Sequence, residues 1–359
     1  MDLELFGWNA VLAEHFASLH RGDPSLVAAR VVCGYRGQYH VWSEIGELTA
    51  RVSGRMMHAA ASRADYPAVG DWVALQPRPN EGVGTIHAVL PRRSAFMRQA
   101  SSGTTEAQVV AANVDTLFLV SAMDQDLNPR RIERYLTLVW ECGADPVIVL
   151  NKADACPDAA GPVKDVEAIA AGVPVYAVSA VTGAGLDELQ RYLLPGVTVA
   201  LLGSSGVGKS TLINRLLGEE RLKTGAVRDD DHRGRHTTTH RELLLIPCGA
   251  LMIDTPGMRA LQLWNETGSL EDTFGDVEAL VTMCRFADCR HGAEPGCAVQ
   301  AALADGTPDR ERYQSYRKLE RELRYLETRQ DQRAAMEEKN RGKRLSRRVK
   351  DLQKSPKHR

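Results

Sequence analysis

Residues 203–210 read Gly-Ser-Ser-Gly-Val-Gly-Lys-Ser, a G-x4-G-K-S spacing that is typical of phosphate-binding loops. An apolar run at 197–202 precedes the loop, and a helical pattern at 211–217 follows it. Glycines let successive backbone N–H groups point at phosphate oxygens, and a helix N-terminus adds positive potential. We expect Lys209 to reach the β- and γ-phosphates and Ser210 to bind Mg2+. The candidate contacts here are Gly203, Ser204, Ser205, Gly206, Val207, Gly208, Lys209, Ser210 and Thr211.

A second polar run predicts which base is bound. Asn151, Lys152 and Asp154 form an N-K-x-D pattern directly after an apolar strand pattern at 146–150. The Asp154 carboxylate can accept from both the ring N–H and the exocyclic amine of guanine, a donor pair that adenine does not offer. Lys152 would lie along the base, and Asn151 would link this loop to the phosphate loop. The sequence therefore predicts guanine nucleotides, GTP and GDP, as ligands.

Further segments complete this pattern. One strand pattern ends in Ser-Ala at 179–180, whose alanine N–H could support the base, and another ends in Asp-Thr-Pro-Gly at 254–257. The polar segment 234–239 lies between the phosphate loop and the Asp-Thr-Pro-Gly run and holds three threonines, of which Thr237 or Thr238 could bind Mg2+. Together these segments predict a GTPase. The candidates added here are Ser179, Ala180, Asp254 and Gly257 for GTP, and Thr238 with Ser210 for Mg2+.

The order of the motifs is unusual. The guanine motifs, at 151 and 179, precede the phosphate motifs, at 203, 237 and 254, whereas GTPases normally begin with the phosphate loop. The sequence therefore predicts a circularly permuted GTPase. Such a permutation is tolerated when the original termini lie close together at the surface.

Met258 follows Gly257 where the template GTPases carry a glutamine that orients the attacking water. We therefore expect slow hydrolysis unless another group acts. His236 is the candidate catalytic residue, because an imidazole can orient water or accept its proton near neutral pH. A solvent-exposed loop histidine is the alternative.

Cys284, Cys289, His291 and Cys297 bring three thiols and one imidazole into a short stretch. This spacing matches a tetrahedral Cys3His zinc site, and four protein ligands leave no position open for catalysis. We expect one structural zinc ion, with independent reduced cysteines as the alternative. Pro308 is expected to open a long helix that packs on this module through Tyr316, Leu319, Leu323 and Leu326.

Glycine-punctuated short strand patterns between residues 30 and 98 predict a small β-barrel of the OB type. Such barrels commonly bind oligonucleotides through aromatic stacking and cations. Ordinary surface arginines and core aromatics are the alternative. The residues that could contact RNA are Tyr35, Arg36, Tyr39, Arg51, Arg55, Arg92, Arg93 and Arg98.

Charge is segregated along the 359 residues. The whole chain carries −1 and residues 339–359 carry +9, so the first 338 residues carry −10. A basic tail favours nucleic acid, although a solubilising tail is the alternative. Nothing approaches the length of a membrane span, and seven cysteines with only three clustered favour a reducing cytoplasm. We take a monomer as the default.

The sequence thus predicts a multidomain α+β protein. Its parts are an N-terminal extension (1–29), an OB-type β-barrel (30–98), a central circularly permuted P-loop GTPase α/β domain (107–273), a C-terminal zinc-binding helical domain (274–338) and a basic tail (339–359).

The permuted motif order, the segment 234–239, the run 254–257 and the cluster 284–297 together resemble the ribosome small subunit-dependent GTPase A family (RsgA) over roughly residues 30–330. The resemblance implies a late assembly factor that binds the small ribosomal subunit and its rRNA in the GTP state. It also implies release after hydrolysis that the subunit stimulates. A GTP-gated RNA-binding scaffold whose hydrolysis is incidental is the second hypothesis. A GTP-dependent metal-delivery protein is the third, which the closed Cys3His set disfavours.

Overall fold

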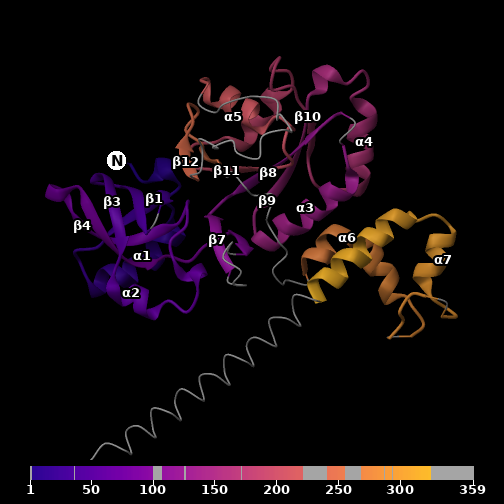
Figure 1. Ribbon diagram of the computed structural model, residues 1–359, viewed down its shortest axis with the longest axis horizontal. Coiled ribbons are helices and arrows are strands. Elements are labelled where there is room, and N and C mark those ends of the chain that lie inside the picture. Colours follow the sequence, from indigo (N-terminus) through magenta and orange to yellow (C-terminus); the bar gives the residue numbers. More distant parts are fainter. Residues whose placement is uncertain are drawn as a thin grey trace, which may run out of the picture. The chain divides into compact units, whose positions relative to one another are not determined.

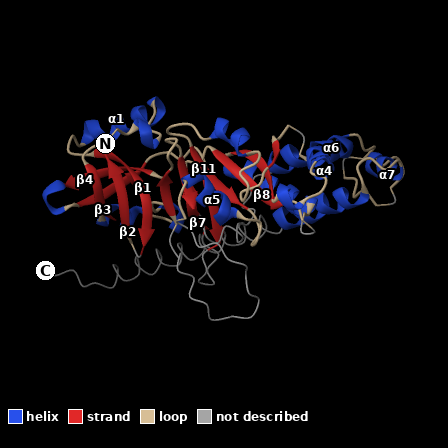
Figure 2. Cartoon of the chain, turned by 90° about the horizontal axis from the view of Figure 1, so that it is seen from above, coloured by secondary structure: helices blue, strands red, loops and turns tan. Residues whose placement is uncertain are grey.

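The computed structural model describes residues 2–35, 37–99, 107–124, 127–170, 172–220, 241–254, 268–286, 288–292 and 294–324. The chain divides into two compact units, residues 1–262 and 263–359. Figure 1 follows their helices and strands along the chain, and Figure 2 colours them by type. Among the described residues, no helix has the length and apolar character needed to cross a membrane.

The first unit begins with a closed five-stranded barrel, as the strand patterns predict (Figure 1). The strands pair in the order β1-β2-β3-β5-β4, and β4 closes the barrel by pairing with β1. Val31, Val41, Leu75 and Ile86 are buried in its core. The strands are β1 (Val27–Tyr35), β2 (Gln38–Ser43), β3 (Gly46–Val52), β4 (Trp72–Arg78) and β5 (Val83–Val89), with the helices α2 (Gly54–Ala59), η2 (Arg63–Asp65) and η3 (Pro79–Glu81) between them.

The N-terminal extension packs on the barrel through aromatic rings. The centroid of the Phe6 ring lies 4.6 Å from that of Trp42, and the centroid of Trp8 lies 4.8 Å from that of Trp72. Burying such rings is strongly favourable, so the extension is part of the folded unit. Its helices are η1 (Glu4–Phe6) and α1 (Ala10–Gly22).

A parallel sheet forms the rest of the first unit, in the order β10-β9-β8-β11-β13-β12, with β12 antiparallel to β13. In β8 and β11 nearly every residue is buried, as expected for strands with both faces covered. Helices α3 and α4 pack against β8, β9 and β10, and α5 shares a core cluster with β8 and β11. The elements are β8 (Thr116–Ala122), α3 (Pro129–Cys142), β9 (Asp145–Asn151), η4 (Ala153–Ala155), α4 (Ala160–Ile169), β10 (Val175–Ala177), η5 (Leu186–Tyr192), β11 (Thr198–Leu202), α5 (Lys209–Leu217), β12 (Glu242–Leu245) and β13 (Leu251–Asp254).

The barrel and the parallel sheet are joined by strand pairing. Cys33 of β1 pairs with Glu242 of β12, so the sheet continues into the barrel. Among the described residues, the strands β6 (Ala95–Gln99) and β7 (Ala107–Ala112), which lie between the two parts in the sequence, pair with each other in a separate two-stranded sheet. The GTPase domain was expected to begin at Ala107, but the first strand of its sheet is β8.

The second unit contains α6 (Gly268–Thr282), α7 (Ala298–Ala304) and a helical stretch at 310–324. That stretch begins two residues after the expected Pro308, because Asp309 Oδ1 accepts from the backbone N–H of Arg312 and caps it. Tyr316, Leu319 and Leu323 are buried as predicted, whereas Leu326 lies outside the described residues. The boundary expected at residue 274 falls at a kink inside α6, where Phe274 has a non-helical backbone (φ −122°, ψ 33°), and the domain boundaries stay a prediction.

Candidate nucleotide site and metal centre

The phosphate-binding pattern lies between β11 and α5. At two of its glycines, neighbouring atoms leave no room for a side chain. A Cβ on Gly203 would overlap the carbonyl oxygen of Val120 on the neighbouring strand β8. Gly208 has a φ of +90°, and a Cβ there would overlap the side-chain amide of Asn151. The strand-loop-helix context that the sequence predicts is therefore present.

Lys209 is the first residue of α5, and its ammonium contacts the backbone of the phosphate loop. Its Nζ donates to the carbonyl oxygens of Gly203 at 2.9 Å and Ser204 at 2.5 Å. Ser210 and Thr211 follow in the first helical turn. A cation and two hydroxyls thus stand at a helix N-terminus, which is the chemistry that a phosphate chain needs.

Asn151 joins the base-binding and phosphate-binding loops. It ends β9 and is 2% exposed. Its Nδ2 donates to the Val207 carbonyl at 2.9 Å, which confirms the expected link to the phosphate loop. Its Oδ1 accepts from the Ala180 backbone N–H at 2.9 Å. The Ala180 N–H that was expected to support guanine therefore positions Asn151 in this structure.

The other members of the guanine pattern surround this junction. Lys152 adopts a positive φ of 65° and its Nζ donates to Asp124 Oδ2 at 2.9 Å. Asp154 lies in η4 with its side chain exposed. Ser179 is buried, and its Oγ accepts from the Thr182 N–H at 3.0 Å. The loop geometry leaves the Asp154 carboxylate accessible to a base.

Several candidate residues cannot be placed. Asp254 ends β13 opposite Glu242 of β12, but its side chain is outside the described part of the chain. His236, Thr238 and Gly257 also lie outside the described residues, as does the basic tail. The assignments of all GTP-contacting and catalytic residues stay predictions.

The metal-ligand candidates converge in the second unit. The ligand atoms of Cys284, Cys289, His291 and Cys297 all lie within 4.8 Å of one another. Cys284 Sγ is 3.8 Å from Cys297 Sγ and 3.5 Å from His291 Nδ1, and Cys297 Sγ is 3.6 Å from the same nitrogen. Bonds of about 2.3 Å to sulfur and about 2.0 Å to nitrogen around tetrahedral zinc give edges of about 3.8 Å and about 3.5 Å. The distances among Cys284, His291 and Cys297 therefore fit zinc, and Cys289 completes a donor set of the right type within 4.8 Å.

The pKa values of the ligand groups are shifted in different directions. A backbone hydrogen bond from His291 acts to lower the pKa of Cys289, but burial and the neighbouring thiols of Cys297 and Cys284 raise it to about 11. Burial acts to raise the pKa of Cys284, but backbone N–H groups of Val299 and Ala298 outweigh it and lower the pKa. Burial, with the charge of Arg317, lowers the pKa of His291 and keeps its imidazole neutral. Thiolate and neutral imidazole are the forms that bind zinc.

The barrel residues proposed as RNA contacts differ in availability. Tyr39 is buried in the barrel core, and Arg92 forms an ion pair of 2.7 Å with the buried carboxylate of Asp71, so these two predictions are wrong. Arg93 is paired with Asp115 at 2.8 Å but remains 57% exposed. Arg36 and the side chain of Arg98 are outside the described residues. The exposed candidates are Tyr35, Arg51 and Arg55.

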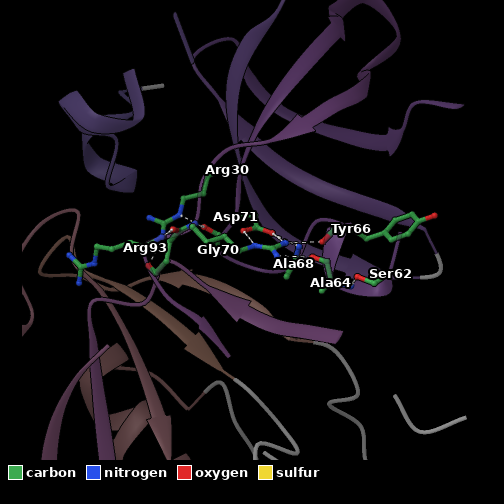
Figure 3. A network of polar contacts seen from close by, with 10 residues as sticks. Arg30, Ser62, Ala64, Tyr66, Ala68, Gly70, Asp71 and Arg93 are labelled. Carbon is green, nitrogen blue, oxygen red and sulfur yellow. Dashed lines mark hydrogen bonds and ion pairs between the residues drawn. The ribbon is translucent and has the colours of Figure 1, made fainter. Parts of the chain in front are cut away.

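Sequence reasoning missed a buried polar network where the barrel meets the parallel sheet (Figure 3). Arg30 is 2% exposed and donates to Thr198 Oγ1 on β11 at 2.7 Å, to the Gly70 carbonyl at 3.3 Å and to the Phe6 carbonyl. Burial lowers the pKa of Arg30 to about 10. A lone charge within the apolar pattern 27–33 was the signal that could have revealed it.

The fold and these loops define a class: a P-loop GTPase with circularly permuted motifs, joined to an OB-type barrel. Residues 89–264 match the model of the RsgA GTPase family. The small ribosomal subunit biogenesis GTPase RsgA of Opitutus terrae is 49% identical over 354 residues, covering 96% of this chain and 96% of that protein. The RsgA 2 of Lactiplantibacillus plantarum is 48% identical and covers 90% of this chain and 92% of its own. The chain belongs to the RsgA family of GTPases.

Two solved structures share the fold. YjeQ from Thermotoga maritima has a TM-score of 0.63 and 29% identity, covering 83% of this chain and 98% of its own. YloQ, described as a circularly permuted GTPase, has a TM-score of 0.57 and 24% identity, covering 85% of this chain and 96% of its own. A circularly permuted GTPase is thus known with this fold.

Proposed function

We propose that this GTPase binds the small ribosomal subunit in the GTP state, assists its late maturation and is released when the subunit stimulates GTP hydrolysis. The observation that carries the nucleotide part is Asn151, whose side chain holds the guanine loop and the phosphate loop together. The names of the relatives, which describe biogenesis of the small ribosomal subunit, support the partner.

The proposed nucleotide site divides the work among three groups of residues. Asp154 would recognise the guanine edge, and the loop N–H groups and Lys209 would hold the phosphates. Ser210 and Thr238 would bind Mg2+, with Asp254 on the Mg2+ side of the site. Bound Mg2+ would neutralise the developing phosphate charge during hydrolysis. His236 is proposed to orient the attacking water, because Met258 cannot.

The remaining parts are proposed to recognise RNA and to stabilise the fold. The exposed barrel residues Arg51 and Arg55 and the tail 339–359 supply cations for rRNA phosphates. One zinc ion held by the Cys3His cluster would cross-link the second unit without taking part in hydrolysis. We propose a cytoplasmic monomer in this role.

The first prediction concerns His236. With wild-type protein, purified small subunits should raise GTP turnover strongly, and His236→Ala should lose most of this stimulation, a fall of about 100-fold or more. His240→Ala, at the histidine directly after the segment 234–239, is the matched control and should keep the stimulation.

Phosphate release with and without subunits measures both effects. If the subunits still stimulate His236→Ala as they do the wild type, His236 has no role in the catalytic step. GTP-dependent binding to subunits without any stimulation would favour the scaffold hypothesis.

A further inference from the structure

The first turn of α3 brings a second cation to the phosphate loop. Asn128 caps this helix by accepting from the Arg131 N–H at 3.1 Å, and Pro129 occupies the first helical position. The cap fixes where α3 begins, and Arg131 therefore extends from the helix end nearest the loop. Its Nη1 donates to Ser204 Oγ at 2.9 Å.

Ser204 is consequently held from two sides. Arg131 binds its side-chain hydroxyl, and Lys209 binds its backbone carbonyl. The contact partners Arg131 and Ser204 are both half-buried, so the hydrogen bond is partly shielded from water. A charge-assisted bond in such a place is stronger than one in full solvent.

The two side-chain anchors of the loop lie at opposite ends of its exposed turn. Arg131 holds Ser204 at the beginning, and Asn151 holds Val207 at the end. Between them Ser205 and Gly206 are exposed, and a Cβ on Gly206 would meet open space among the described residues beyond its own chain neighbours. A loop fixed at both ends loses less entropy when its N–H groups close around phosphates.

We propose that Arg131 is a positioning residue for nucleotide binding, which acts through Ser204 to hold the phosphate loop in its binding conformation. This inference rests on the proposed use of the loop for GTP. Because Arg131 acts on the loop and not on the terminal phosphate, its removal weakens GDP and GTP binding equally.

Titration of the full-length protein with fluorescent GDP and with a fluorescent non-hydrolysable GTP analogue tests this. Arg131→Ala and Ser204→Ala should each raise both dissociation constants about tenfold, as expected for one charge-assisted hydrogen bond. The double variant should be no weaker than either single variant, because both changes remove the same contact. Arg131→Lys should restore part of the affinity.

Arg191→Ala is the matched control, since Arg191 makes an exposed ion pair with Glu188 on the same domain and should not change either constant. Losses that add in the double variant, a loss confined to the GTP analogue, or no loss at all would each overturn the inference. Failure of the wild-type protein to bind either nucleotide would instead overturn the proposed function.

Discussion

Asn151 illustrates what could and could not be predicted at the scale of single residues. Its place after an apolar strand and before Lys152 identified it as part of a guanine motif, and its link to Val207 followed from that motif. Its bond to the Ala180 N–H could not be predicted, because it depends on how two loops from different strands approach each other. Arg30 and Arg131 escaped prediction for the same reason, since their partners lie far away along the chain.

Asp154→Asn tests the identity of the base. The neutral amide loses charge-assisted hydrogen bonds and turns a donor toward the donors of guanine, so GTP affinity should fall about tenfold to 100-fold. Xanthosine triphosphate carries a carbonyl in place of the exocyclic amine and should bind the variant better than the wild type.

Competition titrations with both nucleotides measure the change. Asp165→Asn, at an exposed position on α4, is the control and should leave the preference for GTP unchanged. A variant at Asp154 with unaltered GTP affinity would show that this carboxylate does not read the base.

At the scale of elements, the positions of strands and helices followed from the sequence because each motif stands at the end of an apolar run. The barrel could be predicted from five glycine-separated strand patterns. The separate hairpin of β6 and β7 could not, because β7 has the apolar character of a strand that joins the larger sheet. The pairing of β1 with β12 could not be predicted from the sequence either, since it depends on the tertiary arrangement.

The second unit should show a pH dependence that arises from one ion pair between α6 and the 310–324 helix. Burial acts to raise the pKa of Asp276, but the hydrogen bonds and charge of Arg312 outweigh it, so the pKa lies below its ordinary value of 3.8. At low pH the unfolded state therefore binds the proton more readily. The stabilisation is present above the unfolded pKa and is lost as pH falls through the folded pKa.

Hydrogen exchange of the α6 amides, measured in the wild type and in Asp276→Asn at matched pH values, tests the contribution of the Asp276–Arg312 ion pair to stability. Protection should be lower in the variant at pH 6, and the difference should shrink as pH falls below the ordinary value of 3.8 and disappear only below the folded-state pKa. Asp272→Asn, exposed on the same helix, should behave as wild type. A difference that persists unchanged to low pH would contradict the assigned role of Asp276.

At the scale of the molecule, direct contacts join the barrel of the first unit to the sheet that carries the candidate nucleotide site. Arg30 connects the N-terminal extension and the barrel to β11, the strand that leads into the phosphate loop. Cys33 pairs with β12, the strand that follows the segment containing His236. Under the proposed function, these two links are the contacts through which the nucleotide state would alter RNA binding.

In the proposed function, GTP controls association with the small ribosomal subunit, and co-sedimentation with purified small subunits tests this control most directly. The protein should co-sediment in the presence of a non-hydrolysable GTP analogue and remain in the supernatant with GDP. The difference should exceed about tenfold in affinity, since a switch of that size needs about 1.4 kcal/mol of differential binding. Equal association in GDP and in the analogue, or none in either, would contradict the account.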